Sequence, residues 1–261
     1  MTRYMEEKKT TVTKQETIAA LKKPGELYVV MSGATKMPFV WCDEDTFDDE
    51  VLLYYQLKDA RAKAKELLEQ KYLTAVAKVE EKDLLKFYTS LYTMGVNCLS
   101  VNSGTDIQTS LQLEELVVRK KPEQLPQGQK IVENPALHLT ALYFMQEMRR
   151  QAGQQPSEQL KEMQEELIAH YQKSTLLVAV EEDGKIPLLK QKDGTIYQPV
   201  YTDPSEVQKF IKGKKMKVAA IPALKIPGML AQEAKGVVIN PYGVNVQLQV
   251  ARPKKNPAPV A

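Results

Sequence analysis

Short apolar runs alternate with amphipathic helical stretches along this chain, and one such succession occurs twice. Residues 176–250 predict an apolar strand, a second strand, a helix with an acidic cap, an alanine-rich strand, a further helix, and a strand that starts at Gly236. Residues 27–101 follow the same order and end in a similar segment that begins at Gly95. The pattern therefore predicts an α+β fold of two repeated units, each a mixed sheet with helices packed on it.

In the first half, apolar runs predict strands and amphipathic runs predict helices. Strands are expected at residues 27–31, 38–42, 51–57, 72–79, 98–101 and 111–118, and helices at residues 13–21, 59–68 and 82–94. Asp59 is expected to cap the second of these helices, and Gly95 to end the third. Residues 43–50 are expected to form an acidic loop, because six of these eight residues carry carboxylates.

The second half shows clearer start and stop signals. Strands are expected at residues 176–180, 186–189, 196–201, 218–221, 236–239 and 244–250, and helices from Asn134, after Pro156, from Asp203 and at residues 223–234. Asp183-Gly184 predicts a tight turn that makes 186–189 the hairpin partner of 176–180. Asp203-Pro-Ser-Glu206 predicts a capped helix start.

Polar stretches rich in proline and glycine indicate where the units begin and end. We expect a flexible N-terminus at residues 1–12, a first unit at 13–118, a linker at 119–133, a second unit at 134–251 that begins with a helical hairpin, and a disordered tail at 252–261.

Composition indicates an ordinary soluble protein, with 43% hydrophobic and 26% charged residues. No apolar run is long enough to cross a bilayer, so we expect no membrane association. The N-terminus lacks a signal-peptide core, and two cysteines are too few for a disulfide framework, so a cytoplasmic location is expected. The net charge of +3 is unevenly distributed, with −2 over residues 1–133, −1 over residues 134–173 and +6 over residues 174–261. This asymmetry is too small to predict nucleic-acid binding.

Two blocks of the second half are distinctive. They are Pro187-Leu-Leu-Lys-Gln-Lys-Asp-Gly-Thr-Ile-Tyr-Gln-Pro-Val-Tyr-Thr-Asp203 and Gly236-Val-Val-Ile-Asn-Pro-Tyr-Gly243. Together with the helices that precede them, they make residues 134–250 resemble the SseB family, the "enhanced serine sensitivity" proteins of bacteria. The resemblance implies a bacterial, cytoplasmic protein, and it implies no established reaction and no catalytic residue.

The first half resembles the same domain as a divergent copy. It lacks the Asp-Gly turn and the Asn-Pro-Tyr-Gly turn, and residues 102–104 are the nearest equivalent of the latter. The acidic loop at residues 43–50 replaces the turn at Asp193-Gly194.

Catalytic, metal and cofactor sites are not predicted. The only histidines, His138 and His170, lie on the two helices that begin the second unit, and His138 lies on the apolar stripe of its helix. The acidic loop lacks the glycine and the closing glutamate that an EF-hand calcium loop requires. Cys42 has no nearby histidine in sequence, and no glycine-rich phosphate loop is present.

A binding surface is the chemistry that the sequence favours. In the Asn240–Gly243 turn, asparagine, proline and glycine are explained by turn geometry, whereas Tyr242 is a large amphipathic side chain of the kind that anchors interfaces. Tyr242, Asn240 and Asp193 form one candidate surface. The acidic loop, with Asp43, Asp45 and Asp48, forms the second candidate, whereas the single tryptophan, Trp41, is expected in the core.

These residues lead to a functional hypothesis with an alternative. The hypothesis is a non-catalytic binding, adaptor or regulatory protein, monomeric or weakly self-associating, that uses no cofactor and binds a protein partner. The alternative is an enzyme or a small-molecule sensor with a pocket between the two repeats, where concave sites commonly form.

Overall fold

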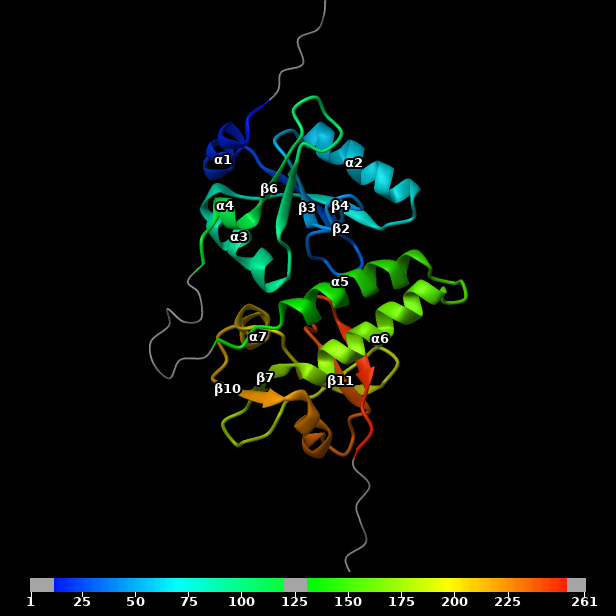
Figure 1. Ribbon diagram of the computed structural model, residues 1–261. Coiled ribbons are helices and arrows are strands. Elements are labelled where there is room, and N and C mark those ends of the chain that lie inside the picture. Colours follow the sequence, from blue (N-terminus) through cyan, green and yellow to red (C-terminus); the bar gives the residue numbers. More distant parts are fainter. Residues whose placement is uncertain (1–11, 120–130, 253–261) are drawn as a thin grey trace, which may run out of the picture. The chain divides into compact units, whose positions relative to one another are not determined.

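The computed structural model describes residues 12–119 and 131–252 (Figure 1). The chain divides into two compact units, Met1–Lys120 (unit 1) and Lys121–Ala261 (unit 2). The predicted flexible N-terminus, linker and tail lie almost wholly outside the described residues. Among the residues that are described, no helix has the length and apolar character to cross a membrane.

Unit 1 is built on a mixed sheet with the strand order β4-β1-β3-β5-β6, to which β2 adds beside β3. Strands β3 and β5 pair in parallel, whereas the pairs β1-β3, β1-β4, β2-β3 and β5-β6 are antiparallel. The elements are α1 (Lys14–Lys22), β1 (Tyr28–Ser32), β2 (Val40–Cys42), β3 (Asp49–Tyr54), α2 (Leu57–Glu69), β4 (Thr74–Lys78), η1 (Glu81–Asp83), α3 (Leu84–Thr93), β5 (Cys98–Val101), β6 (Thr109–Gln112) and α4 (Leu113–Leu116).

Unit 2 starts with two packed helices, followed by strands and shorter helices. The elements are α5 (Pro135–Arg150), α6 (Glu158–Lys173), β7 (Thr175–Val180), β8 (Leu189–Lys190), β9 (Ile196–Val200), α7 (Pro204–Ile211), β10 (Lys217–Pro222), η3 (Ala223–Met229), β11 (Gly236–Ile239) and β12 (Val246–Gln249). The strands form a pair, β10-β7, and a four-stranded sheet, β12-β11-β9-β8, and a single bridge between Leu177 and Tyr201 connects β7 to the end of β9.

Most strand pairings of the two units correspond, but the β1-β3 ladder of unit 1 is matched in unit 2 only by the isolated Leu177–Tyr201 bridge. The parallel pair β9-β11 of unit 2 matches the parallel pair β3-β5 of unit 1. Strand β12 then occupies the place of β6, and β8 the place of β2. The antiparallel pair β7-β10 occupies the place of the pair β1-β4. The α+β class is therefore confirmed. The repeat agrees with this shared order but stays a prediction, because unrelated sequences also share topologies.

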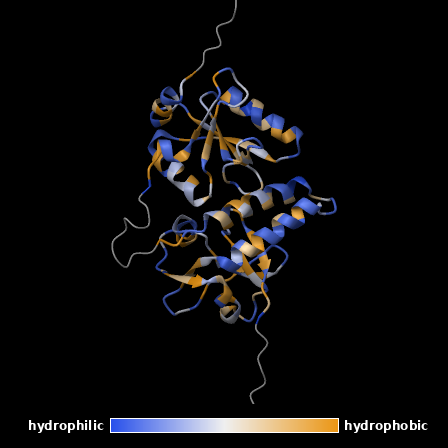
Figure 2. Ribbon diagram, in the orientation of Figure 1, coloured by the Kyte–Doolittle hydropathy of each residue, from blue (hydrophilic) through white to orange (hydrophobic). Residues whose placement is uncertain are grey.

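Apolar side chains form a core on one face of the unit 1 sheet. Alternate residues of β1 and β3, namely Tyr28, Val30, Leu52 and Tyr54, pack with Phe39 and with the α2 residues Ala60, Ala64 and Leu67. This spacing follows from the two-residue period of a strand and the 3.6-residue period of a helix. In Figure 2 the strands are largely apolar, whereas α2 and α6 carry both apolar and hydrophilic residues.

Three local expectations for unit 1 are wrong. The strand after the acidic loop begins at Asp49 rather than residue 51, and it buries Glu50. Helix α2 starts at Leu57 after Gln56, which makes no side-chain capping bond, so Asp59 is in the first turn and is not the cap. Residues 113–116, expected in a strand, form α4, because the Gln112 and Glu115 side chains make a capping box there.

Two further expectations for unit 2 are wrong. The Asp183-Gly184 turn forms, with the Glu181 amide donating to the Lys185 carbonyl at 2.8 Å, but the segment after it does not pair with β7. Strand β7 pairs with β10 instead, and β8 pairs with β9. The helix expected at 223–234 is only the short 3-10 helix η3, which contains Pro227.

Gly236 begins β11 at a point where no side chain fits. A Cβ there would lie 2.0 Å from the carbonyl oxygen of Leu248 on β12. At Gly228, by contrast, an added Cβ would meet no atom within 4 Å.

We expect Gly236→Ala to lower the free energy of unfolding by about 1–3 kcal/mol, because the backbone of β12 must shift. Gly228→Ala is the matched control and should change it by less than about 0.5 kcal/mol. Urea denaturation of both variants measures the difference, and equal stabilities would contradict the close approach at Gly236.

Candidate functional site: an asparagine-held turn

In each unit, an asparagine in the left-handed conformation ends the second strand of the parallel pair. Asn240 follows β11 with φ 45°, and Asn102 follows β5 with φ 53°. The Asn240 amide donates to the Val200 carbonyl at 2.9 Å, and the Asn102 amide donates to the Leu53 carbonyl at 2.7 Å. Asparagine tolerates this conformation better than other residues with a Cβ.

The side chains of these asparagines bind the neighbouring strand a second time. Oδ1 of Asn240 accepts a hydrogen bond from the Thr202 amide at 3.0 Å, and Oδ1 of Asn102 accepts one from the Tyr55 amide at 3.1 Å. We call this double attachment the asparagine clamp. It makes Asn102 the structural counterpart of Asn240, as the sequence predicts for residues 102–104.

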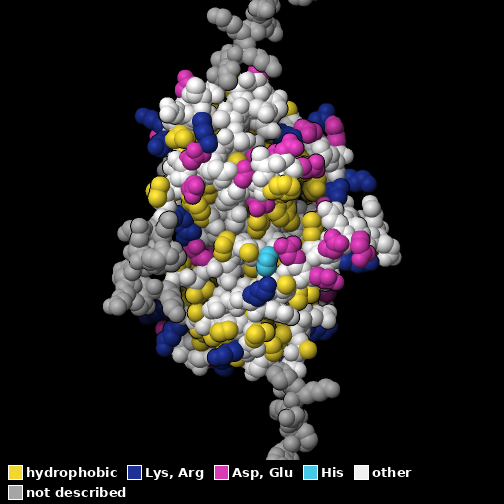
Figure 3. Space-filling view, viewed as in Figure 1, with side chains coloured by type: hydrophobic (Ala, Val, Ile, Leu, Met, Phe, Trp, Pro, Cys, Tyr) yellow, Lys and Arg dark blue, Asp and Glu magenta, His cyan; other side chains and the backbone are white. Residues whose placement is uncertain are grey.

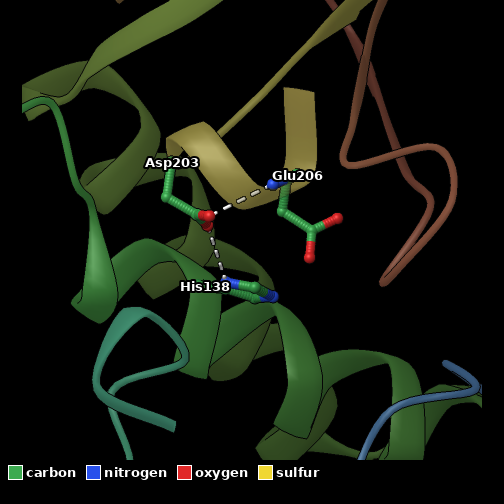
Figure 4. Close-up of side chains that lie close together, drawn as sticks. All are labelled: His138, Asp203 and Glu206. Atoms are coloured by element: carbon green, nitrogen blue, oxygen red, sulfur yellow. Dashed lines mark hydrogen bonds and ion pairs between the residues drawn. The ribbon is translucent and has the colours of Figure 1, made fainter. Parts of the chain in front are cut away.

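In unit 2 the clamp continues into a fully buried polar network, of which Figure 4 shows His138 and Asp203. Asn240 Nδ2 donates to Thr202 Oγ1 at 2.8 Å, and that hydroxyl donates to Asp203 Oδ2 at 2.7 Å. His138 Nδ1, from α5, lies 3.3 Å from Thr202 Oγ1 and 3.5 Å from Asp203 Oδ2. The network therefore links α5, the end of β9 and the turn after β11.

Asp203 also caps α7, as its sequence context predicts. Its Oδ1 accepts hydrogen bonds from the amides of Ser205 at 2.9 Å and Glu206 at 3.2 Å. Burial by itself would raise the pKa of Asp203, but hydrogen bonds from His138, Ser205 and Thr202 outweigh it and lower the pKa to about 2. Asp203 is thus held as a buried carboxylate.

Asn134 occupies the N-cap position of α5. Its side chain makes no capping bond to α5. Instead, Nδ2 donates to the carbonyls of Thr175 and Thr202, both at 2.8 Å, which ties the start of α5 to β7 and to the residue beside the clamp.

His138, Asp203 and Glu206 bring possible metal-ligand atoms within 4.8 Å of one another, and all three residues are buried. Both carboxylate oxygens of Asp203 already accept protein hydrogen bonds, and Glu206 Oε1 accepts one from Lys209. A metal ion would compete with these bonds at Asp203, whereas Glu206 Oε2 has no hydrogen-bond partner among the described residues. The arrangement fits a structural polar network better than a metal centre.

The clamp carries a turn that presents Tyr242. The amides of Gly243 and Asn245 donate to the Asn240 carbonyl at 2.8 and 3.0 Å. The Tyr242 ring lies 6.1 Å from the Phe210 ring of α7, with Lys212 Nζ 5.7 Å from its centroid, and its side chain remains 56% exposed. Asn240 itself is fully buried, so its predicted place on the contact surface is wrong, and it positions the turn instead.

The remaining predicted surface residues fall into two groups. Asp193 is exposed, and its Oδ1 accepts a hydrogen bond from the Thr195 amide at 2.9 Å in the turn between β8 and β9. Within the described residues, Asp193 makes no hydrogen bond or ion pair with Tyr242.

In the acidic loop, Asp43 and Asp48 stabilise the local structure. Asp43 Oδ1 accepts a hydrogen bond from the Thr46 amide at 2.8 Å. This bond, together with hydrogen bonds from the Asp45 amide and the Thr46 hydroxyl, lowers the pKa of Asp43. Asp48 accepts hydrogen bonds from Asn97 at 2.6 Å and Gln112 at 2.9 Å. Asp45 remains exposed. Phe47, two residues further along the loop, is 78% exposed with φ 57°, and its sequence context does not predict this exposure.

The two thiols are poor candidates for nucleophiles. Burial, with the nearby carboxylates of Asp49 and Asp43, raises the pKa of Cys42. Burial and Glu50 raise the pKa of Cys98 well above its ordinary range. Because the thiolate is the reactive species, neither environment favours nucleophilic catalysis.

Comparison with known proteins bears on unit 2. Residues 151–253, less than half of the chain, match the family described as SseB protein N-terminal domain. The predicted resemblance is therefore confirmed over this segment, which includes both the clamp and Tyr242. The search of curated proteins found no match.

Two solved structures resemble the chain weakly. Tic22 from Plasmodium falciparum is 12% identical, over 85% of this chain and 90% of that one, with a TM-score of 0.22. Anabaena Tic22 (protein transport) is 12% identical, over 87% of this chain and 93% of that one, with a TM-score of 0.21.

Asp203 should make the free energy of unfolding depend on pH. Because folding lowers its pKa to about 2, its contribution of about 2–3 kcal/mol is present above the unfolded value near 4 and is lost as the pH falls from about 4 to 2. We expect the difference in unfolding free energy between wild type and Asp203→Asn to shrink over that interval.

Urea denaturation between pH 2 and pH 7 measures this difference, with Asp45→Asn as the control for an exposed aspartate. A difference that is constant across the interval would contradict the role of the ionised Asp203 carboxylate.

Proposed function

We propose that this chain is a non-catalytic binding or adaptor protein that contacts a protein partner through the Tyr242 surface of unit 2. The observation that carries the proposal is an aromatic side chain more than half exposed on a turn whose anchor is fully buried. Large aromatic residues on rigid supports lose little conformational entropy on binding and are common interface anchors.

The surroundings of Tyr242 indicate the chemistry of the partner. Lys212 Nζ lies over the Tyr242 ring, and Lys214 Nζ lies 5.9 Å from the centroid of the Phe210 ring. Lys212 ends α7 in the left-handed conformation, φ 39°, which fixes where this basic segment begins. A surface with aromatic rings and ammonium groups suits a partner segment that carries both apolar and acidic side chains.

Three further features support the proposal. The segment that matches the SseB domain contains the Tyr242 surface. The acidic loop of unit 1 offers a second surface patch, in which Phe47 and Asp45 are exposed. Both thiols have a raised pKa, which disfavours a cysteine-based reaction. Cys42 and Cys98 are free, which fits the bacterial cytoplasm that we include in the proposal.

Substituting Tyr242 should remove the partner without unfolding unit 2. We expect Tyr242→Ala to reduce partner recovery at least about tenfold, equivalent to about 1.4 kcal/mol or more, which is typical of an interface anchor. Affinity purification from the native cell, followed by measurement of the affinity for the recovered partner, tests this expectation.

Leu224→Ala is the matched control, because Leu224 is also exposed and lies on η3. It should retain the partner, and circular dichroism should be the same for both variants. The proposal is wrong if Tyr242→Ala retrieves the same partners at the same affinity as wild type.

A further inference from the structure

A polar cavity of about 180 Å³ opens in unit 1 beside helix α2. Its walls come from α2 and from the strands β2, β3, β5 and β6. In the view of Figure 3, acidic side chains lie on the part of unit 1 that carries α2, with lysine and arginine side chains among them. The cavity is distinct from the turn of unit 2 and has its own chemistry.

The cavity exists because the side chains on this face of the sheet become smaller and more polar from β3 to β6. Leu52, Ser100 and Ser110 are neighbours in register, so they lie side by side on the face that α2 covers. Leu52 packs into the core with Leu67 of α2, whereas the two serines do not fill the space beyond it. A large apolar residue at either serine would close the cavity.

Glu50 lies in the cavity wall and is only 6% exposed. Its Oε1 accepts a weak hydrogen bond from the Cys98 thiol at 3.3 Å. Burial raises the pKa of Glu50, and hydrogen bonds from Cys98 and Ser100 offset that effect only in part. Among the described residues, no cationic side chain forms an ion pair with Glu50.

The other charged groups of the cavity leave an excess of negative charge. Asp43 and Glu66 line it together with Glu50, and the one lysine in the lining, Lys63, already pairs with Glu66 at 2.8 Å. Trp41 supplies an aromatic wall. Carboxylates beside an indole ring are groups that recognise a cation by ion pairing and cation–π attraction.

We propose that this cavity binds a cationic nitrogen group, an ammonium or a guanidinium, with Glu50 as its ion-pair partner and Trp41 as its aromatic wall. The volume suits one amino-acid side chain or a small free amine rather than a drug-sized molecule. The group can thus belong to a lysine or arginine of a protein segment or to a free amine, which share the same chemistry.

This role differs in a measurable way from a purely structural one. A buried carboxylate without a cation is unfavourable to folding, so neutralising it should stabilise the empty protein. We therefore expect Glu50→Gln to raise the urea midpoint of unfolding while weakening ligand binding. A residue needed only for packing would lower the midpoint on substitution.

Titration calorimetry of the full chain tests the proposal with defined probes. N-acetyl-arginine methylamide and N-acetyl-lysine methylamide represent protein side chains, and agmatine represents a free amine. The citrulline and norleucine analogues are neutral controls of similar shape. We expect the cationic probes to bind at least about tenfold more tightly than their neutral analogues. The ratio of the affinity for the amide probes to the affinity for agmatine then shows whether the cationic group belongs to a protein side chain or to a free amine.

Variants distinguish binding in the cavity from a general attraction of cations to the negative charge of the loop. Glu50→Gln should weaken binding of the cationic probes at least tenfold, and Ser110→Leu should do the same by filling the space without changing the charge. Glu44→Gln removes an exposed carboxylate of the same acidic loop and should change binding by less than about twofold.

The proposal is overturned if wild type binds no cationic probe at millimolar concentration, if the neutral analogues bind equally well, or if Glu44→Gln weakens binding as much as Glu50→Gln. A Glu50→Gln variant that is less stable than wild type also contradicts it. None of these results bears on the Tyr242 surface, which is tested separately.

Discussion

Each unit depends on the asparagine clamp at the end of its parallel strand pair. A strand end leaves amide groups that the ladder no longer satisfies, and a buried amide without a partner is unfavourable by about 1–3 kcal/mol. Asn240 satisfies the Thr202 amide with a side-chain oxygen, and Asn102 does the same for the Tyr55 amide. The left-handed backbone of both asparagines makes this geometry possible and turns the chain away from the sheet.

The same framework supports different surfaces in the two units. In unit 2 the clamp joins the buried network of Thr202, Asp203 and His138, and the turn that it holds displays Tyr242. In unit 1 the hairpin between β2 and β3 carries the acidic loop, and the sheet face leaves a polar cavity at Glu50. A rigid scaffold with variable loops and faces is a common way for one fold to carry several binding functions.

Much of this architecture follows from the sequence, because apolar periodicity and local capping are short-range signals. The alternation of strands and helices, the Asp203 cap and the correspondence of Asn102 with Asn240 were all predictable. The burial of Glu50 and Asn240 was not, because a carboxylate in an acidic run and an asparagine in a turn are normally exposed. Their environments depend on strands distant in sequence, as does the pairing of β7 with β10.

Hydrogen exchange at the Thr202 amide tests the clamp most directly. Asn240→Gly keeps the left-handed conformation accessible but removes both side-chain hydrogen bonds to Thr202. We predict that the Thr202 amide exchanges at least about tenfold faster in this variant, whereas the amides of β7 and β10 keep their protection. Unchanged protection of Thr202 would contradict the claim that Asn240 holds the turn that carries Tyr242.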